Sequence, residues 1–152
     1  MLSVANIQCD GTLHYSSNYG AKTVQLAAPG SNIYSTSTEN DGDTSSSFNS
    51  TAKSGYETMT GTSMAAPMVA GVAAMLYSKY ENYSILDIKN AILNSVSKMD
   101  TLEGKVSSDG MLNALGAVEL LENGTITAST PVPTANTTVA PVSYTHLTLP
   151  TI

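Results

Sequence analysis

The chain contains no arginine and few lysines. Six basic residues, all of them lysine, stand against twelve Asp and Glu, which gives a formal net charge of -6 over 152 residues. Proteins that bind nucleic acids usually present a basic surface, in which arginine makes bidentate contacts to phosphate. The composition therefore predicts that the chain has no nucleic-acid partner.

Cysteine and long apolar runs are also scarce. Cys9 is the only cysteine, which excludes a disulfide within the chain and a zinc site built from cysteines. A lone cysteine is more often a small buried residue than a reactive thiol, so we expect Cys9 to be buried. No apolar run reaches the roughly 18 residues of a membrane-spanning helix, and no secretory-signal pattern follows Met1.

The composition changes near Glu122. Apolar residues make up 41% of the chain and charged residues 12%, and the patterned apolar segments lie within residues 1–121, which we expect to form one folded unit. After Glu122 there is no charged side chain. The Thr, Pro and Ala content of residues 122–141 predicts a disordered linker or stalk.

The last eleven residues, 142–152, differ in sequence character from the linker before them. The peptide VSYTHLTLPT at residues 142–151 resembles a translated sequencing adapter. We therefore expect residues 142–152 to be a disordered artefact and the natural protein to continue beyond Pro141, with a native apolar tail as the alternative. His146 then has no functional role.

The folded part alternates short apolar strands with helical patterns. Such alternation predicts an α/β fold with a parallel sheet. The expected strands are Met1–Asn6 and Val24–Ala28, with a further extended piece at Ile33 and Tyr34 and an exposed polar loop at Ser37–Lys53. The expected helices are Thr62–Tyr80, a segment that begins after Ser84 and includes Val96 on its apolar face, and Asn113–Leu121.

Two of these helices have informative sequences. Ser84 and Asp87 form a capping-box pattern at the start of the second helix. The first helix is rich in Ala and has one charged residue, Lys79. Such a helix is expected to be buried on nearly all sides, and Gly71 in its interior suggests close packing, because glycine costs about 1 kcal/mol there relative to Ala.

The start of the first helix is the candidate site. Gly61, Thr62 and Ser63 precede the Ala-rich run, which places the Ser63 hydroxyl where unpaired N–H groups and the helix dipole favour negative charge. The Ser63 N–H could donate to an oxyanion. The alternative is that Thr62 or Ser63 is simply the N-cap.

The full string GTSMAAPMVAG at residues 61–71 closely resembles the nucleophile motif of the subtilisin-like serine peptidases, or subtilases. That motif usually reads Gly-Thr-Ser-Met-Ala-x-Pro-His-Val-Ala-Gly, so Met68 replaces a histidine that is not part of the catalytic triad. Other segments that resemble the family are Leu2–Ala5, Ser17–Gly20, Leu26–Gly30 and Ser108–Ala114. The resemblance covers residues 1–121, the C-terminal part of a catalytic domain.

This resemblance implies an incomplete subtilisin-like parallel sheet with packed helices. It makes Ser63 the acyl-forming nucleophile and a backbone oxyanion donor, with Thr62 supporting the oxyanion site. The implied activity is that of a serine endopeptidase acting on protein or peptide substrates, outside the cell or at its surface. No cofactor is expected in this stretch, although the full-length parent could bind calcium.

The resemblance also implies that catalytic groups lie elsewhere. In subtilases the triad runs Asp, His, Ser along the chain, and the Asp, the His and the oxyanion Asn precede the serine by more residues than precede Ser63 here. We therefore expect this chain alone to be inactive. The alternative is a non-catalytic subtilase-like module that binds or displays.

Two groups of titratable residues could suggest other functions, namely a catalytic triad and a calcium site. Asp10 and His14 precede Ser63 in triad order, but their spacing does not match the family. Glu39, Asp41 and Asp43 lack the glycine and distal Glu of a calcium-binding hand, so a solvated loop is expected there.

Overall fold

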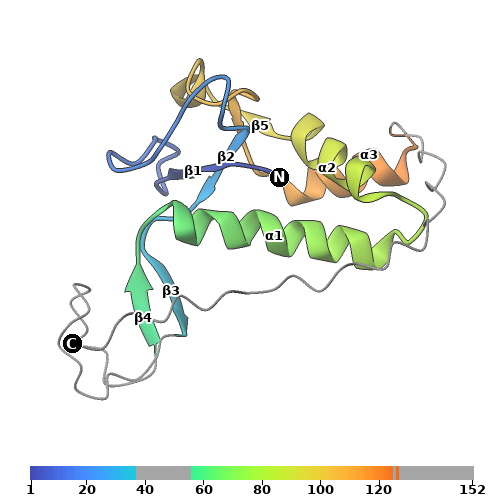
Figure 1. The fold of residues 1–152 in the computed structure, drawn as a ribbon, viewed down its shortest axis with the longest axis horizontal. Coiled ribbons are helices and arrows are strands. Elements are labelled where there is room, and N and C mark those ends of the chain that lie inside the picture. Colours follow the sequence, from blue (N-terminus) through green and yellow to red (C-terminus); the bar gives the residue numbers. More distant parts are fainter. Residues whose placement is uncertain (37–55, 125, 127–152) are drawn as a thin grey trace, which may run out of the picture.

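The computed structural model describes residues 1–36, 56–124 and 126. Its main sheet has four strands in the order β1-β2-β6-β5 (Figure 1). The strands are β1 (Val4–Ile7), β2 (Leu26–Pro29), β5 (Ser97–Lys98) and β6 (Gly110–Met111). β2 pairs in parallel with both β1 and β6, whereas β5 runs antiparallel to β6. The predicted α/β fold with a parallel sheet is confirmed.

A separate hairpin projects from the beginning of the longest helix (Figure 1). It consists of β3 (Ile33–Thr36) and β4 (Tyr56–Met59), which pair antiparallel from Ile33 opposite Met59 to Thr36 opposite Tyr56. The extended piece at Ile33 was predicted, but its partner strand was not.

Within the described residues, three α-helices and one short 3₁₀ helix accompany the strands. They are α1 (Thr62–Lys79), α2 (Ile85–Asn94), α3 (Ala114–Glu122) and the 3₁₀ helix η1 (Asp100–Leu102). α1 packs on β1 and β2, and α2 packs on α1 and α3. The first and third helices lie within two residues of their predicted bounds, whereas the second ends at Asn94, so Val96 lies beyond it.

The sheet separates two apolar clusters. Leu26 and Ala28 belong to the cluster formed with α1, α2 and α3. Ala5, Ile7 and Ala27 belong to the opposite cluster, together with residues in and after η1. Alternate residues of β2 therefore point to opposite faces, as expected of a strand covered on both sides.

The predicted capping box is present at the start of α2. The Ser84 hydroxyl accepts from the Asp87 N–H at 3.2 Å, and the Ser84 N–H donates to Asp87 Oδ2 at 2.9 Å. These reciprocal bonds satisfy donors that a helix start otherwise leaves unpaired. The capping box therefore fixes the backbone at the start of α2.

Polar contacts join the C-terminal ends of α1 and α3. Lys79 Nζ lies 2.7 Å from Glu122 Oε1, which also accepts from the Tyr80 hydroxyl at 2.9 Å. Hydrogen bonds from Lys79 and Tyr80 lower the pKa of Glu122, and the bond to Glu122 raises the pKa of Lys79. Both side chains are about half exposed, so the pair orients the two helix ends more than it stabilises the fold.

Several predictions on burial and position need correction. Cys9 is exposed rather than buried, because it lies two residues after the end of β1 and begins a surface turn. Glu122, assigned to the linker, is the last residue of α3. The Ser37–Lys53 loop, the linker beyond residue 126 and the segment 142–152 lie outside the described residues.

The prediction that α1 is buried on nearly all sides is wrong for the part of the chain that the structure describes. Only Ala65, Val69 and Leu76 of this helix are buried. A Cβ added at Gly71 would meet no atom within 4 Å. The sheet covers one side of α1 and α2 covers part of another, so its remaining small residues face outward.

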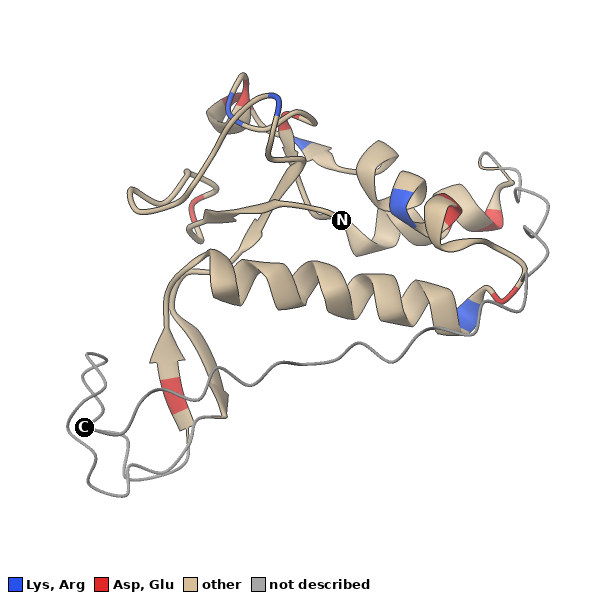
Figure 2. Ribbon diagram, viewed as in Figure 1, with Lys and Arg blue, Asp and Glu red and all other residues tan. Residues whose placement is uncertain are grey.

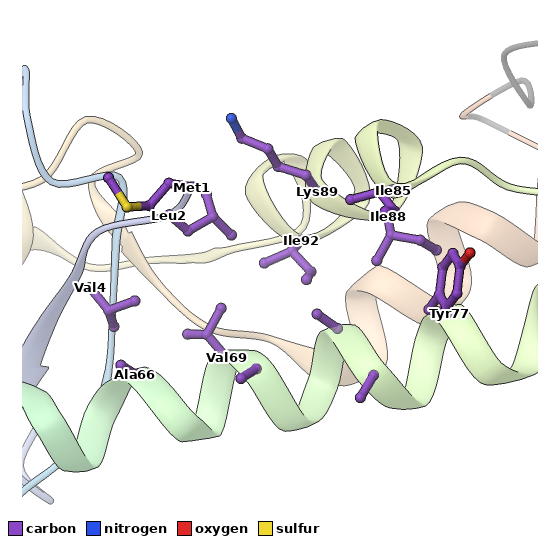
Figure 3. Close-up of a pocket in the computed structure, with 13 residues that line it drawn as sticks. Met1, Leu2, Val4, Ala66, Val69, Tyr77, Ile85, Ile88, Lys89 and Ile92 are labelled. Carbon is purple, nitrogen blue, oxygen red and sulfur yellow. The ribbon is translucent and has the colours of Figure 1, made fainter. Parts of the chain in front are cut away.

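One open side of α1 forms an apolar groove of about 630 Å³ (Figure 3). It is lined by Leu2 and Val4 from the N-terminal segment, Val69 of α1 and Ile92 of α2, among others. Lys89 of α2 is the only charged residue among those that line the groove, and α1 itself is charged only at Lys79 in its last turn (Figure 2). Within the described residues, no helix is long and apolar enough to cross a membrane.

The open surface at Gly71 predicts that Gly71→Ala stabilises this chain by about 1 kcal/mol, because alanine favours a helix interior and meets no neighbour here. Urea unfolding followed by circular dichroism measures the change.

Gly110→Ala is the matched control. Its new Cβ would lie 2.7 Å from Val96 Cγ2 and 2.8 Å from the Ser97 carbonyl oxygen, so it should lower the unfolding midpoint. A lower midpoint for Gly71→Ala as well would contradict an open surface at α1.

Candidate active site

Ser63 is the second residue of α1 and is exposed. The helix begins after Gly61, whose extended backbone provides no side-chain cap, and the Gly61 carbonyl accepts from the N–H groups of Met64 and Ala65 at 3.0 and 3.2 Å. Neither Thr62 nor Ser63 is therefore the N-cap, and the alternative interpretation of these hydroxyls as caps is wrong. The first N–H groups of the helix, including that of Ser63, point out of its open end.

The close approach of Gly30 and Gly61 sets the position of this helix start. The Gly61 N–H donates to the Gly30 carbonyl at 2.8 Å. A Cβ at Gly30 would lie 2.6 Å from the Gly61 oxygen and 2.8 Å from the Ala65 nitrogen, so only glycine leaves room for the first turn of α1. The Asn32 N–H also donates to Thr60 Oγ1 at 2.8 Å, which joins the same two loops.

This junction lies at the carboxyl edge of the parallel strands. Gly30 follows the last residue of β2, and its N–H donates to the carbonyl of Ile7, the last residue of β1, at 3.4 Å. The carboxyl ends of parallel strands are the usual place for ligand and catalytic groups in open α/β sheets. Ser63 thus has the location expected of a functional side chain.

A hollow of about 300 Å³ lies beside Ser63, between α1 and the β3–β4 hairpin. Met59, Met64 and Met68 contribute apolar surface, and Glu57 is the only charged residue among those that line it. Sequence reasoning did not predict this hollow. The signal in the sequence was the Tyr56–Met59 segment, which ends two residues before Gly61 and has the pattern of a short strand next to a turn.

Asp10 and His14 are held in their own surface turns. His14 Nδ1 is 2.8 Å from Ser16 Oγ, and Asp10 Oδ1 accepts from the Thr12 hydroxyl and N–H at 2.7 and 2.9 Å. The hydrogen bond from the Thr12 side chain, followed by that from its backbone, lowers the pKa of Asp10. Neither residue is hydrogen-bonded to Ser63, so the structure does not assemble a triad from them.

Within the described residues, no side-chain hydrogen bond reaches Ser63, and no cluster of three His, Cys, Asp or Glu could hold a metal ion. The acidic residues at 39–43 lie outside the described part of the chain. The site therefore consists of the Ser63 hydroxyl, the N-terminus of α1 and the hollow beside them.

Comparison with known proteins identifies the family. The model of the subtilase family matches residues 1–118. This chain belongs to the subtilase family. The earlier resemblance is therefore confirmed, and the chain is part of a subtilisin-like serine peptidase domain.

Individual subtilases show how much of the domain the chain represents. It is 35% identical over 120 residues to subtilisin-like protease 2 of Plasmodium falciparum, covering 76% of this chain and 8% of that protein. It is 36% identical over 124 residues to subtilisin-like protease 1 of Plasmodium vivax, covering 79% and 18% respectively. The chain thus spans less than a fifth of either protease.

Solved subtilase structures have the same fold. The subtilase cytotoxin SubAB assembly superposes with a TM-score of 0.62 at 27% identity, covering 81% of this chain and 38% of the matched chain. The prenylagaramide maturation protease PagA gives a TM-score of 0.62 at 29% identity, covering 80% and 42% respectively. The predicted subtilisin-like fold class is confirmed.

The crowding at Gly30 predicts that Gly30→Ala displaces the first turn of α1. The hydrogen bonds from Met64 and Ala65 to the Gly61 carbonyl should weaken, and their amides should exchange with deuterium at least about tenfold faster.

Gly71→Ala is the matched control for this measurement, because it adds the same methyl group to α1 where no atom lies within 4 Å. If exchange at Met64 and Ala65 were equal in the two variants, Gly30 would not position the helix start.

Proposed function

We propose that this chain supplies the nucleophile of a subtilisin-like serine endopeptidase and that Ser63 is that nucleophile. The supporting observation is the exposed Ser63 hydroxyl at an uncapped helix start, at the carboxyl edge of a subtilase sheet. The substrate would be a protein or peptide, and the hollow between α1 and the β3–β4 hairpin would hold part of it.

The chemistry follows from the position of Ser63. Its Oγ attacks the carbonyl carbon of the scissile bond while a general base accepts the hydroxyl proton. The carbonyl oxygen gains negative charge, which the Ser63 N–H and the helix dipole stabilise, and Thr62 supports this site from the neighbouring position. The C–N bond then breaks, the amine leaves with the proton, and water hydrolyses the acyl-enzyme.

The general base and its orienting carboxylate would come from a segment that precedes this one in the complete protein. In the family, Asp and His come before Ser along the chain, and no described side chain is hydrogen-bonded to Ser63. The apolar groove supports this arrangement, because a subtilase segment packed there would cover α1 (Figure 3). Met1 itself is among the residues that line the groove.

This arrangement makes the chain alone inactive. Calcium binding by the complete protein stays a prediction that rests on the family resemblance. An extracellular or cell-surface location is part of the same proposal, based on the family resemblance. An intact nucleophile motif favours catalysis over a binding or display module, which would have no need of the serine.

Active-site labelling tests this proposal. A fluorophosphonate probe should label Ser63 when the chain is joined to the preceding subtilase segment encoded upstream in the source DNA, because only then is the serine activated. Labelling of the chain alone should stay at background. Mass spectrometry of the labelled peptide identifies the modified residue.

Ser63→Ala should abolish labelling of the joined protein, whereas Ser78→Ala, at an exposed serine of the same helix, should not. No labelling of a folded joined protein would favour the binding module. Rapid labelling of the chain alone would show that the base lies within it.

The same joined protein tests whether a segment covers α1. Gly71→Ala should stabilise the chain alone but destabilise the joined protein by about 1 kcal/mol or more, because the added methyl group would then meet the covering segment. The free energy of unfolding in urea measures both effects. The same sign in both proteins would contradict close packing at Gly71.

A further inference from the structure

Asn6 is a polar residue in β1, the edge strand of the main sheet as the described residues form it. It is fully buried, between the apolar Ala5 and Ile7 of β1. Its backbone is satisfied, since its N–H donates to Ser17 Oγ at 2.8 Å and its carbonyl accepts from the His14 N–H at 3.0 Å. Neither bond needs an asparagine side chain.

The Asn6 side chain reaches the junction that holds α1. Its Oδ1 accepts from the Ser31 hydroxyl at 3.1 Å. A Cβ at Gly30 would lie 2.8 Å from this Oδ1 and 2.6 Å from the Gly61 oxygen. The Asn6 amide and the start of α1 therefore both lie against Gly30. Asn6 therefore contacts the loop after β2 where that loop binds the segment leading to Ser63.

The other half of the amide is unpaired. Within the described part of the chain, Asn6 Nδ2 is buried and has no hydrogen-bond partner. An unsatisfied buried donor is unfavourable, and an apolar side chain would avoid that penalty. Stability alone therefore does not explain an asparagine at this position.

We infer that Asn6 is a positioning residue for the nucleophile. Its Oδ1 holds Ser31, and through Ser31 the Gly30 carbonyl, in the place where the Gly61 N–H binds and α1 begins. Ser63 is two residues beyond Gly61, so a shift of this junction moves its hydroxyl. This inference depends on the proposed function of Ser63.

Kinetics of the joined protein described above test the inference through Asn6→Ala. Because a small displacement of a reacting group lowers the chemical rate, kcat for a peptide substrate should fall about tenfold or more, with KM changed less than about twofold. Because the substitution also removes the unpaired donor, the thermal unfolding midpoint should be unchanged or higher.

Ser31→Ala should lower kcat in the same way, and the double variant should show less than the product of the two single effects, because both act through one hydrogen bond. Gln25→Ala is the control. Gln25 precedes β2 at the opposite end of the β1–β2 pair, where its Oε1 accepts from the Ser3 N–H at 2.7 Å. It should leave kcat unchanged.

An unchanged kcat in Asn6→Ala would overturn the inference, as would a kcat loss accompanied by a lower unfolding midpoint, which indicates a purely structural role. If the wild-type joined protein fails to label at Ser63, the proposed function fails separately. Deuterium exchange of the chain alone then tests the positioning role. The Met64 and Ala65 amides should exchange faster in Asn6→Ala than in Gln25→Ala. Equal exchange rates in the two variants would overturn the positioning role.

Discussion

The hydrogen bond between the Gly61 N–H and the Gly30 carbonyl is the contact on which the arrangement of this molecule depends. At 2.8 Å it joins the end of a central strand to the beginning of the longest helix. Both partners are glycines, and at Gly30 a side chain would collide with the backbone of α1. Because this contact is between backbone atoms, small changes in it are transmitted directly to the helix axis and to Ser63.

Much of this arrangement could be predicted from the sequence. The motif at residues 61–71 identified the family, which the match over residues 1–118 confirms. The β1 and β2 strands, the capping box at Ser84 and the bounds of α1 follow from local patterns of apolar spacing and capping. These features are encoded within short windows, so one sequence suffices to find them.

The remaining features depend on contacts between distant segments. β5 and β6 contain two residues each, and they form because the segments 97–98 and 110–111 meet, which no local pattern indicates. The Asn6 contact with Ser31 spans 25 residues. The burial of α1 was overestimated for a related reason: its composition indicates close neighbours on every side, whereas the described residues provide them on only part of its surface.

The contact between the C-terminal ends of α1 and α3 determines where the chain after Glu122 leaves the domain. Along the axis of α1, Ser63 and Lys79 are 16 residues apart, which corresponds to about 24 Å between the site and the Lys79–Glu122 pair. The chain after Glu122 therefore starts at the end of α1 that is far from Ser63 (Figure 1). A segment that continues from this point therefore leaves the domain without passing the hollow beside Ser63, and that end of α1 stays clear of the attachment.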